Sequence, residues 1–125
     1  MRTIKFRGMK DNDKNEWVYG YLTKTKHDYL IGENEDSSKY YVKPETVGQY
    51  TGKCDKTTAT EIYEGDILYS FRINEYFVVK WDKSSARFIL KNESATADWL
   101  DGSEYEFEYE VVGNIYNDPE LVEGE

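Results

Sequence analysis

Residues 104–111 read Glu-Tyr-Glu-Phe-Glu-Tyr-Glu-Val, the most regular stretch of the sequence. Charged and apolar residues alternate here with a period of two, which is the period of a β-strand. A strand places Tyr105, Phe107, Tyr109 and Val111 on one face and the glutamates on the other, whereas a helix would scatter both sets. The pattern therefore predicts a half-buried strand with an acidic outer face.

Shorter segments elsewhere carry similar strand signals and are separated by turn residues. The predicted strands cover residues 4–7, 17–22, 27–31, 40–42, 67–73, 76–81 and 87–90. Helical turns are expected only over residues 94–100 and after Asp118-Pro119, where Asp would cap the turn and Pro would take its first position. We therefore predict a mainly β protein (β-rich α+β) with little helix, a composition typical of small barrels or paired sheets.

The middle of the chain indicates a division into two modules. Residues 53–61 are polar and are expected to form an exposed loop. We therefore expect an N-terminal β-hairpin module over residues 1–60 and a second module over residues 61–125, both packed as one structural unit. A chain of 125 residues can bury a sizeable core.

Acidic charge is concentrated in the second half of the chain. The net charge is −9, yet residues 1–62 carry 11 Lys or Arg against 10 Asp or Glu, and residues 63–125 carry 5 against 15. Such a field repels phosphate backbones, so nucleic acid is not the expected partner. The same charge also keeps a small protein in solution, which is its more common role.

Few residues offer catalytic or metal chemistry. His27 is the only histidine and Cys54 the only cysteine, so the chain can form neither an internal disulfide nor a typical transition-metal site. Asp11-x-Asp13-x-Asn15 resembles the start of a calcium loop, but Glu16 and Leu22 stand where that loop needs Gly and Glu. No nucleophile elbow, phosphate loop or dinucleotide motif is present. We expect neither an enzyme nor a cofactor.

The sequence gives no sign of membrane insertion or export. No stretch approaches the 18 apolar residues of a membrane span, and the first ten residues lack the apolar centre of a signal peptide. We expect a cytoplasmic protein.

The acidic face of residues 104–111 is the first candidate for an interaction site. Alternate side chains of a strand are about 6–7 Å apart, close to two phosphate steps of a nucleic-acid strand. This row could therefore act as a decoy for a nucleic-acid-binding enzyme, or it could be a solvated face that prevents aggregation of a sheet edge. The row consists of Glu104, Glu106, Glu108 and Glu110.

Two further features are open to either a binding or a structural interpretation. The chain has twelve tyrosines, which suit protein interfaces but suit strands equally well. A cluster of basic residues near Phe6 and Trp17 could contact a nucleic-acid strand, although acidic neighbours oppose it. That cluster consists of Arg2, Lys5, Arg7, Lys10 and Lys14.

Three segments together resemble a known family. They are Ile4-Lys5-Phe6-Arg7, then residues 46–52 (Thr-Val-Gly-Gln-Tyr-Thr-Gly) followed by residues 61–67 (Glu-Ile-Tyr-Glu-Gly-Asp-Ile), and residues 111–121 (Val-Val-Gly-Asn-Ile-Tyr-Asn-Asp-Pro-Glu-Leu). In order and spacing the chain is similar to the YopX-like family of small bacteriophage and prophage proteins. It departs from the family at Gly8-Met9, where Ala-Trp is usual, and at residues 57–60, where an Asn-Gly turn is usual.

The resemblance implies a phage or prophage origin, a bacterial host cell and a C-terminal SH3-like barrel after an N-terminal β-rich part. It implies no activity. Glycines shared with the family are expected where the backbone takes positive φ or packs closely, at Gly48, Gly52, Gly65 and Gly113. We expect an accessory protein that acts through protein–protein contacts, with itself as a homo-oligomer or with a host protein. The alternatives are the acidic decoy and a weak nucleic-acid-binding module.

Overall fold

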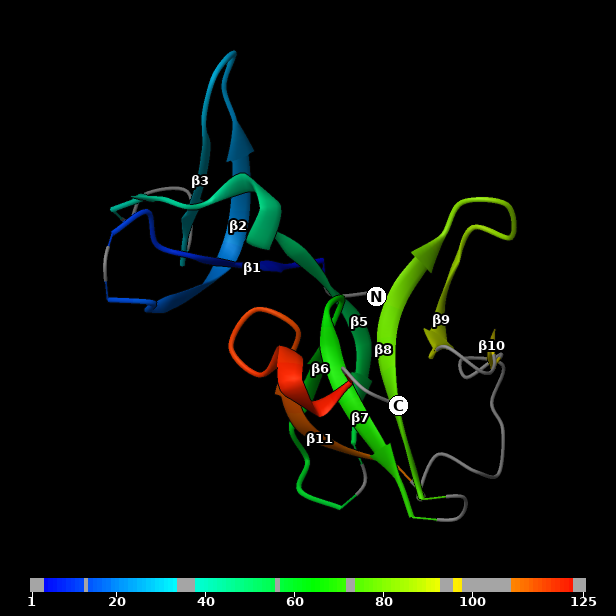
Figure 1. Cartoon of the computed structure of the whole chain (residues 1–125). Coiled ribbons are helices and arrows are strands. Elements are labelled where there is room, and N and C mark those ends of the chain that lie inside the picture. The colour runs from blue at the N-terminus through cyan, green and yellow to red at the C-terminus, as the bar shows by residue number, and fades with distance from the viewer. Residues whose placement is uncertain are drawn as a thin grey trace. The chain divides into compact units, whose positions relative to one another are not determined.

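The computed structural model describes residues 4–12, 14–33, 38–55, 57–71, 74–92, 96–97 and 109–122. Two antiparallel sheets and two short 3₁₀ turns make up its regular structure (Figure 1). The strand orders are β4-β3-β2-β1-β5-β6 and β10-β9-β8-β7-β11. The predicted mainly β class is therefore confirmed. No helix in this part of the chain is long and apolar enough to cross a bilayer.

The chain divides into two compact units, residues 1–52 and residues 53–125. The first unit contains β1 (Phe6–Met9), β2 (Trp17–Lys24), β3 (Tyr29–Gly32), β4 (Tyr40–Tyr41), the 3₁₀ turn η1 (Pro44–Thr46) and most of β5 (Gly48–Cys54). The second unit contains β6 (Glu61–Tyr63), β7 (Asp66–Ser70), β8 (Glu75–Asp82), β9 (Arg87–Lys91), β10 (Thr96–Ala97), β11 (Tyr109–Asn114) and the 3₁₀ turn η3 (Pro119–Leu121).

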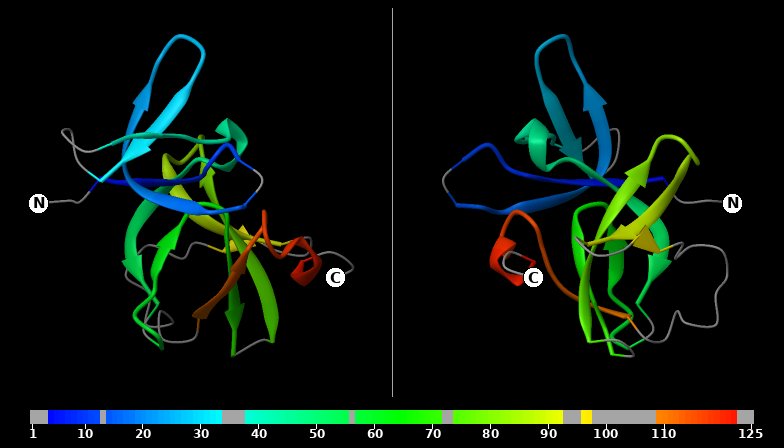
Figure 2. Two further views of the ribbon diagram at one scale, coloured as in Figure 1. Left: turned by 90° about the vertical axis from the view of Figure 1, so that its left-hand side faces the viewer. Right: turned by 45° about the vertical axis from the view of Figure 1, so that its right-hand side comes forward.

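Strand β2 pairs with a different neighbour in each half. Trp17–Gly20 lies opposite β1, and Tyr21–Lys24 lies opposite β3. Gly20 stands at the change with φ of 147°, and a Cβ there would come within 2.1 Å of the Gly32 carbonyl oxygen. Gly20 therefore packs closely against the end of β3, and the strand curves strongly along its length (Figure 2).

Alternation along β2 builds the core of the first unit. Val18 is buried together with Ile31 and Val42, and Leu22 packs against this cluster from the same face of β2. Because successive side chains of a strand point to opposite faces, the tyrosines between these residues are directed outward.

The second unit encloses a larger apolar core. Six buried side chains from β6, β7, β8 and β9 form it, and Tyr109 and Val111 of β11 pack against it. Those six are Ile62, Leu68, Phe77, Val79, Phe88 and Leu90. Tyr109 and Val111 thus take the inward face that the alternating pattern predicts, while residues 104–108 lie outside the described residues. The SH3-like closure of this module stays a prediction.

The prediction of an exposed loop over residues 53–61 is wrong at both ends. Lys53 and Cys54 belong to β5, Glu61 begins β6, and Asp55 is only 2% exposed. The Asp55 side chain can be buried because its carboxylate accepts hydrogen bonds from Thr58 and from the backbone of β11. The two compact units divide after residue 52, whereas the sequence suggested a boundary after residue 60.

Two predicted helical turns have different outcomes. Thr96 and Ala97 pair antiparallel with β9, so the described part of residues 94–100 is strand, because sheet pairing overrides a weak local helix preference. The C-terminal turn is confirmed, with Pro119 in its first position. Asp118 makes no side-chain capping bond, however, and its carboxylate accepts a hydrogen bond from the Asn114 backbone at 3.3 Å instead.

Candidate interaction surface

Four exposed tyrosines distinguish the first unit. They lie on β2 and β4 and are between 44% and 59% exposed, although most of a tyrosine side chain is an apolar ring. They are Tyr19, Tyr21, Tyr40 and Tyr41. Strand register places Tyr21 and Tyr41 on the same outer face, and we call this pair the tyrosine surface.

Strand register shows how two of these side chains are placed. Tyr41 lies opposite Leu30, and Leu30 lies opposite Thr23, so Tyr41 shares a face with Thr23 and with Tyr21 two residues earlier. The core residues Leu22 and Ile31 occupy the other face. Lys39 donates a hydrogen bond to the Thr23 hydroxyl at 3.1 Å, which adds a cation to this outer face.

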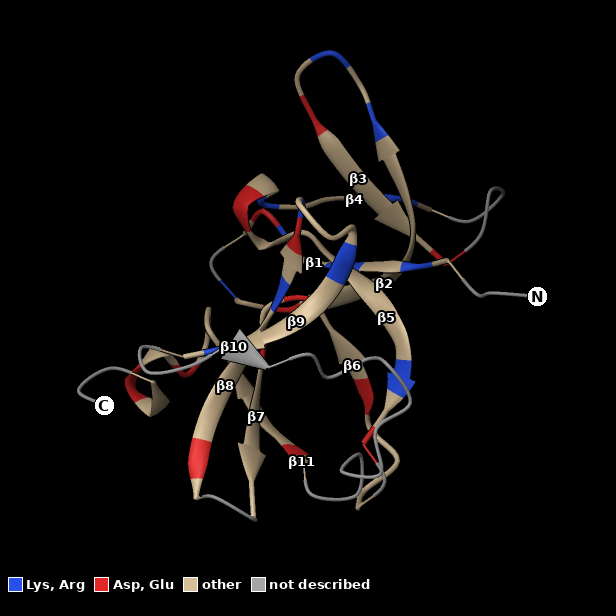
Figure 3. Ribbon diagram, turned by 90° about the vertical axis from the view of Figure 1, so that its right-hand side faces the viewer, with Lys and Arg blue, Asp and Glu red and all other residues tan. Residues whose placement is uncertain are grey.

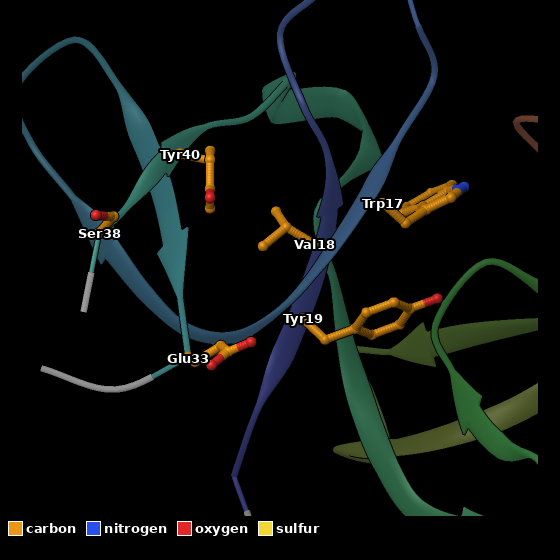
Figure 4. A pocket seen from close by; sticks show the side chains of 6 residues that line it. All are labelled: Trp17, Val18, Tyr19, Glu33, Ser38 and Tyr40. Carbon is orange, nitrogen blue, oxygen red and sulfur yellow. The ribbon is translucent and has the colours of Figure 1, made fainter.

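An open depression of about 350 Å³ lies beside the other two tyrosines. Figure 4 shows Trp17 and Tyr19 projecting from one side of β2, and Val18 projecting from the other side toward Tyr40. Polar groups complete the lining, which consists of Trp17, Val18, Tyr19, Glu33, Ser38 and Tyr40. The depression is therefore mixed in character, with aromatic walls and one carboxylate.

Two cations of the predicted basic cluster, Arg7 and Lys10, contact residues of the first unit itself. Arg7 is only 5% exposed, and its guanidinium lies 4.7 Å from the centre of the Trp17 ring. Lys10 lies 4.1 Å from the centre of the Tyr40 ring and pairs with Glu16 at 3.4 Å. These cations stabilise the unit's own rings and one of its own carboxylates, which leaves them poorly placed for a phosphate backbone.

The remaining members of that cluster do not restore a basic face. Lys5 lies 5.0 Å from the centre of the Tyr50 ring. Lys14 is exposed in the turn before β2, and Arg2 lies outside the described residues.

Only one glutamate of the predicted acidic row can be placed. Glu110 is half-buried on β11 and lies opposite Tyr69 of β7. Glu104, Glu106 and Glu108 lie outside the described residues. Figure 3 shows acidic segments on β6, β8 and β11.

The structure also reveals an aromatic group that the sequence did not identify. The Tyr69 ring centre lies 5.7 Å from that of Phe71 and 5.1 Å from that of Tyr76. We call these three residues the aromatic strip. Tyr69 and Tyr76 are cross-strand partners on the face of β7 and β8 that points away from the core residue Leu68. Phe71 directly follows β7 and is 46% exposed. The alternation of residues 67–71 predicts that Tyr69 and Phe71 share a face, but only the β7–β8 register shows that Tyr76 lies beside them.

The other residues that could take part in catalysis or metal binding do not form a reactive site among the described residues. His27 is exposed in the turn between β2 and β3, and Cys54 is half-buried at the end of β5. Burial raises the pKa of Asp55, but hydrogen bonds from Val111 and Thr58 outweigh that effect and hold its pKa below the ordinary value of an aspartate. Within the described ranges, no group of three or more His, Cys, Asp or Glu could hold a metal ion.

The comparisons agree with the resemblance seen in the sequence. The model of the YopX protein family matches residues 5–123, which is nearly the whole chain. The chain belongs to the YopX family. A search of curated proteins finds no match to this YopX-family chain.

Proposed function

We propose that this YopX-family protein is a phage or prophage accessory protein that acts through protein–protein contacts in the cytoplasm of a bacterial host. The observation that carries the proposal is the tyrosine surface. Tyrosine is enriched in the buried centres of protein interfaces, because its rigid ring covers a large area and its hydroxyl can hydrogen-bond at the rim. Two such side chains, each more than half exposed on one face of a sheet, support binding rather than catalysis.

The charge of the first unit suits either a second copy of the chain or a host protein. Residues 1–52 carry nine Lys or Arg and eight Asp or Glu, a net charge of +1. Two such surfaces can therefore meet without strong repulsion. Self-association and capture of a host protein are the two forms of this proposal.

The test compares two double variants of the same positions. Tyr21→Ser with Tyr41→Ser removes both rings from the outer face, whereas Tyr21→Phe with Tyr41→Phe keeps the rings and serves as the matched control. We expect the wild type and the Phe control to self-associate in sedimentation velocity, or to retain one stoichiometric protein from nuclease-treated host lysate. The Ser variant should lose that association. A wild-type protein that stays monomeric and retains nothing would contradict the proposal.

The second candidate function is an acidic decoy that inhibits a host nucleic-acid-binding enzyme. Its support is charge: residues 53–125 carry seven Lys or Arg and seventeen Asp or Glu, a net charge of −10. Replacing the four glutamates 104, 106, 108 and 110 by Gln should abolish capture of such an enzyme, and DNA should compete with the wild type. Unchanged capture by the Gln variant would reject the decoy.

Direct nucleic-acid binding has the least support, since Arg7 is buried and Lys10 is paired. Retention of the protein on a DNA or RNA column at low salt, and its loss as the salt concentration rises, would support direct nucleic-acid binding. The SH3-like barrel that the resemblance implies for the second unit is likewise a proposal. Its support is the single core that β6, β7, β8, β9 and β11 share.

A further inference from the structure

We infer that the aromatic strip is a binding site for an arginine-bearing segment of a partner protein. The strip lies in the second unit, so the inference does not depend on the tyrosine surface. It also differs from the acidic decoy, because it rests on ring faces and not on a row of glutamates.

The geometry of the strip provides ring faces and a carboxylate side by side. Tyr69 lies between its two ring neighbours, and its hydroxyl donates a hydrogen bond to Asn74 at 2.7 Å, which holds the ring in place. Glu110 is the cross-strand partner of Tyr69, and side chains paired in this way have Cβ atoms about 5 Å apart. A guanidinium that stacks on Tyr69 would therefore be within reach of the Glu110 carboxylate.

The first unit shows what such rings bind when a cation is within reach. Four of its basic side chains lie over aromatic rings, with cation-to-centre distances from 4.1 to 5.4 Å. Among the residues that the structure describes, no Lys or Arg lies over Tyr69, Phe71 or Tyr76. Within the described residues, the strip thus offers the same kind of acceptor with no cation over it, and a partner can supply one.

Charge and shape select arginine from the cations that a protein can offer. The net charge of −10 on residues 53–125 attracts basic segments. A guanidinium is planar, stacks on aromatic faces and can bind a carboxylate with two hydrogen bonds, whereas an ammonium is a strongly hydrated point charge. Lysine should therefore bind more weakly than arginine.

Two basic residues of the chain itself could compete for the rings. Lys91 lies on the same face but opposite Val78, and Arg72 lies outside the described residues. The double variant Arg72→Ala with Lys91→Ala should bind a partner's arginine at least as tightly as the wild type. A loss of binding in this variant would overturn the inference.

The experiment titrates the ¹⁵N-labelled full chain with a Gly-Ser peptide that carries three spaced arginines, and with its lysine and citrulline counterparts. We expect the arginine peptide to shift the amide signals of Tyr69, Phe71, Tyr76 and Glu110. The lysine peptide should bind more weakly, and the neutral citrulline peptide should not bind. Equal binding of the citrulline peptide, or shifts confined to β2 and β4, would contradict the inference.

Variants assign the binding to the rings and the carboxylate. Phe71→Ala should lower the affinity for the arginine peptide by at least about fivefold, whereas Phe71→Tyr should retain the affinity. Glu110→Gln should also weaken binding, and Glu120→Gln, which removes the same charge from exposed η3, should not. Equal weakening by both Gln variants would mean that net charge alone attracts the peptide. Tyr21→Ser with Tyr41→Ser should leave this titration unchanged, which separates it from the proposed function.

Discussion

The carboxylate of Asp55 accepts a hydrogen bond from the backbone N–H of Val111 at 2.9 Å, between residues 56 positions apart in the sequence. It also accepts bonds from the Thr58 backbone at 2.6 Å and from the Thr58 hydroxyl at 2.8 Å. One buried side chain therefore ties β11 to the turn between β5 and β6. We expect Asp55→Ala to lower the free energy of unfolding by about 1–3 kcal/mol, because it leaves these donors without an acceptor. Urea denaturation followed by tryptophan fluorescence measures the loss.

Asp82 is the matched control for this substitution. It lies in the turn between β8 and β9, where hydrogen bonds from Ser85 and Ser84 lower its pKa. Water can replace those partners in an exposed turn, so Asp82→Ala should shift the urea midpoint much less than Asp55→Ala. Equal shifts would show that the Asp55–Val111 bond does not hold β11.

The same carboxylate predicts a pH dependence of stability. Hydrogen bonds hold the pKa of Asp55 in the folded protein below its ordinary value, so the folded state favours the ionised form more than the unfolded chain does. Its contribution is therefore complete above about pH 5, where the unfolded chain is also ionised, and is lost as the pH falls through the folded pKa. The difference in unfolding free energy between wild type and Asp55→Asn should stay constant from neutral pH to about pH 5 and shrink below about pH 4. Urea titrations across this range test it, and a difference that does not change with pH would contradict it.

Gly20 should tolerate substitution less well than Gly52. A Cβ on Gly20 would overlap the Gly32 carbonyl oxygen at 2.1 Å, where the backbone of two strands cannot separate without breaking their pairing. Gly52 also has positive φ, 88°, but no atom lies within 4 Å of its Cβ position. We expect Gly52→Ala to cost about 1–2 kcal/mol of backbone strain and Gly20→Ala to cost distinctly more. Equal losses in urea denaturation would mean that β2 and β3 can move apart at Gly20.

Thr46 provides a buried hydroxyl that links η1 to β1. Its Oγ1 accepts a hydrogen bond from the Met9 backbone at 2.9 Å and donates one to the Lys43 carbonyl at 2.6 Å. Thr46→Val keeps the shape but leaves the Met9 N–H unsatisfied, which should cost about 1–3 kcal/mol. Thr46→Ser keeps the hydroxyl and loses only a methyl group, so we expect a cost of about 1 kcal/mol or less. A Ser variant that is less stable than the Val variant would contradict this role.

Local patterns were sufficient for the strands with strong alternation or a long β-branched run. Residues 76–81 were predicted as a strand and lie within β8, because aromatic and β-branched side chains suit a pleated sheet whatever surrounds them. The inward face of β11 at Tyr109 and Val111 was likewise predictable from its period of two. At these positions the local preference and the tertiary packing agree.

Features that depend on distant partners were not predictable in the same way. The sequence shows that Asp55 is polar, which predicts an exposed loop residue. It does not show that the backbone N–H of Val111 will donate a hydrogen bond to the Asp55 carboxylate and allow its burial. Composition could not decide which tyrosines are exposed: Tyr63 is buried, and Tyr21 is more than half exposed. The aromatic strip needs the register of β7 and β8, which no local pattern specifies.

Strand β5 crosses the division between the two units, which fall on either side of residue 52. Expression of either unit alone would therefore cut a strand and not a linker. The first unit would end in a shortened β5. The second would begin with the last two residues of β5, so its β6 would lack most of the neighbouring strand. Unpaired strand edges recruit other chains, so separately produced halves should aggregate where the full chain does not. Functional dissection of this protein is accordingly better served by point substitutions than by truncation.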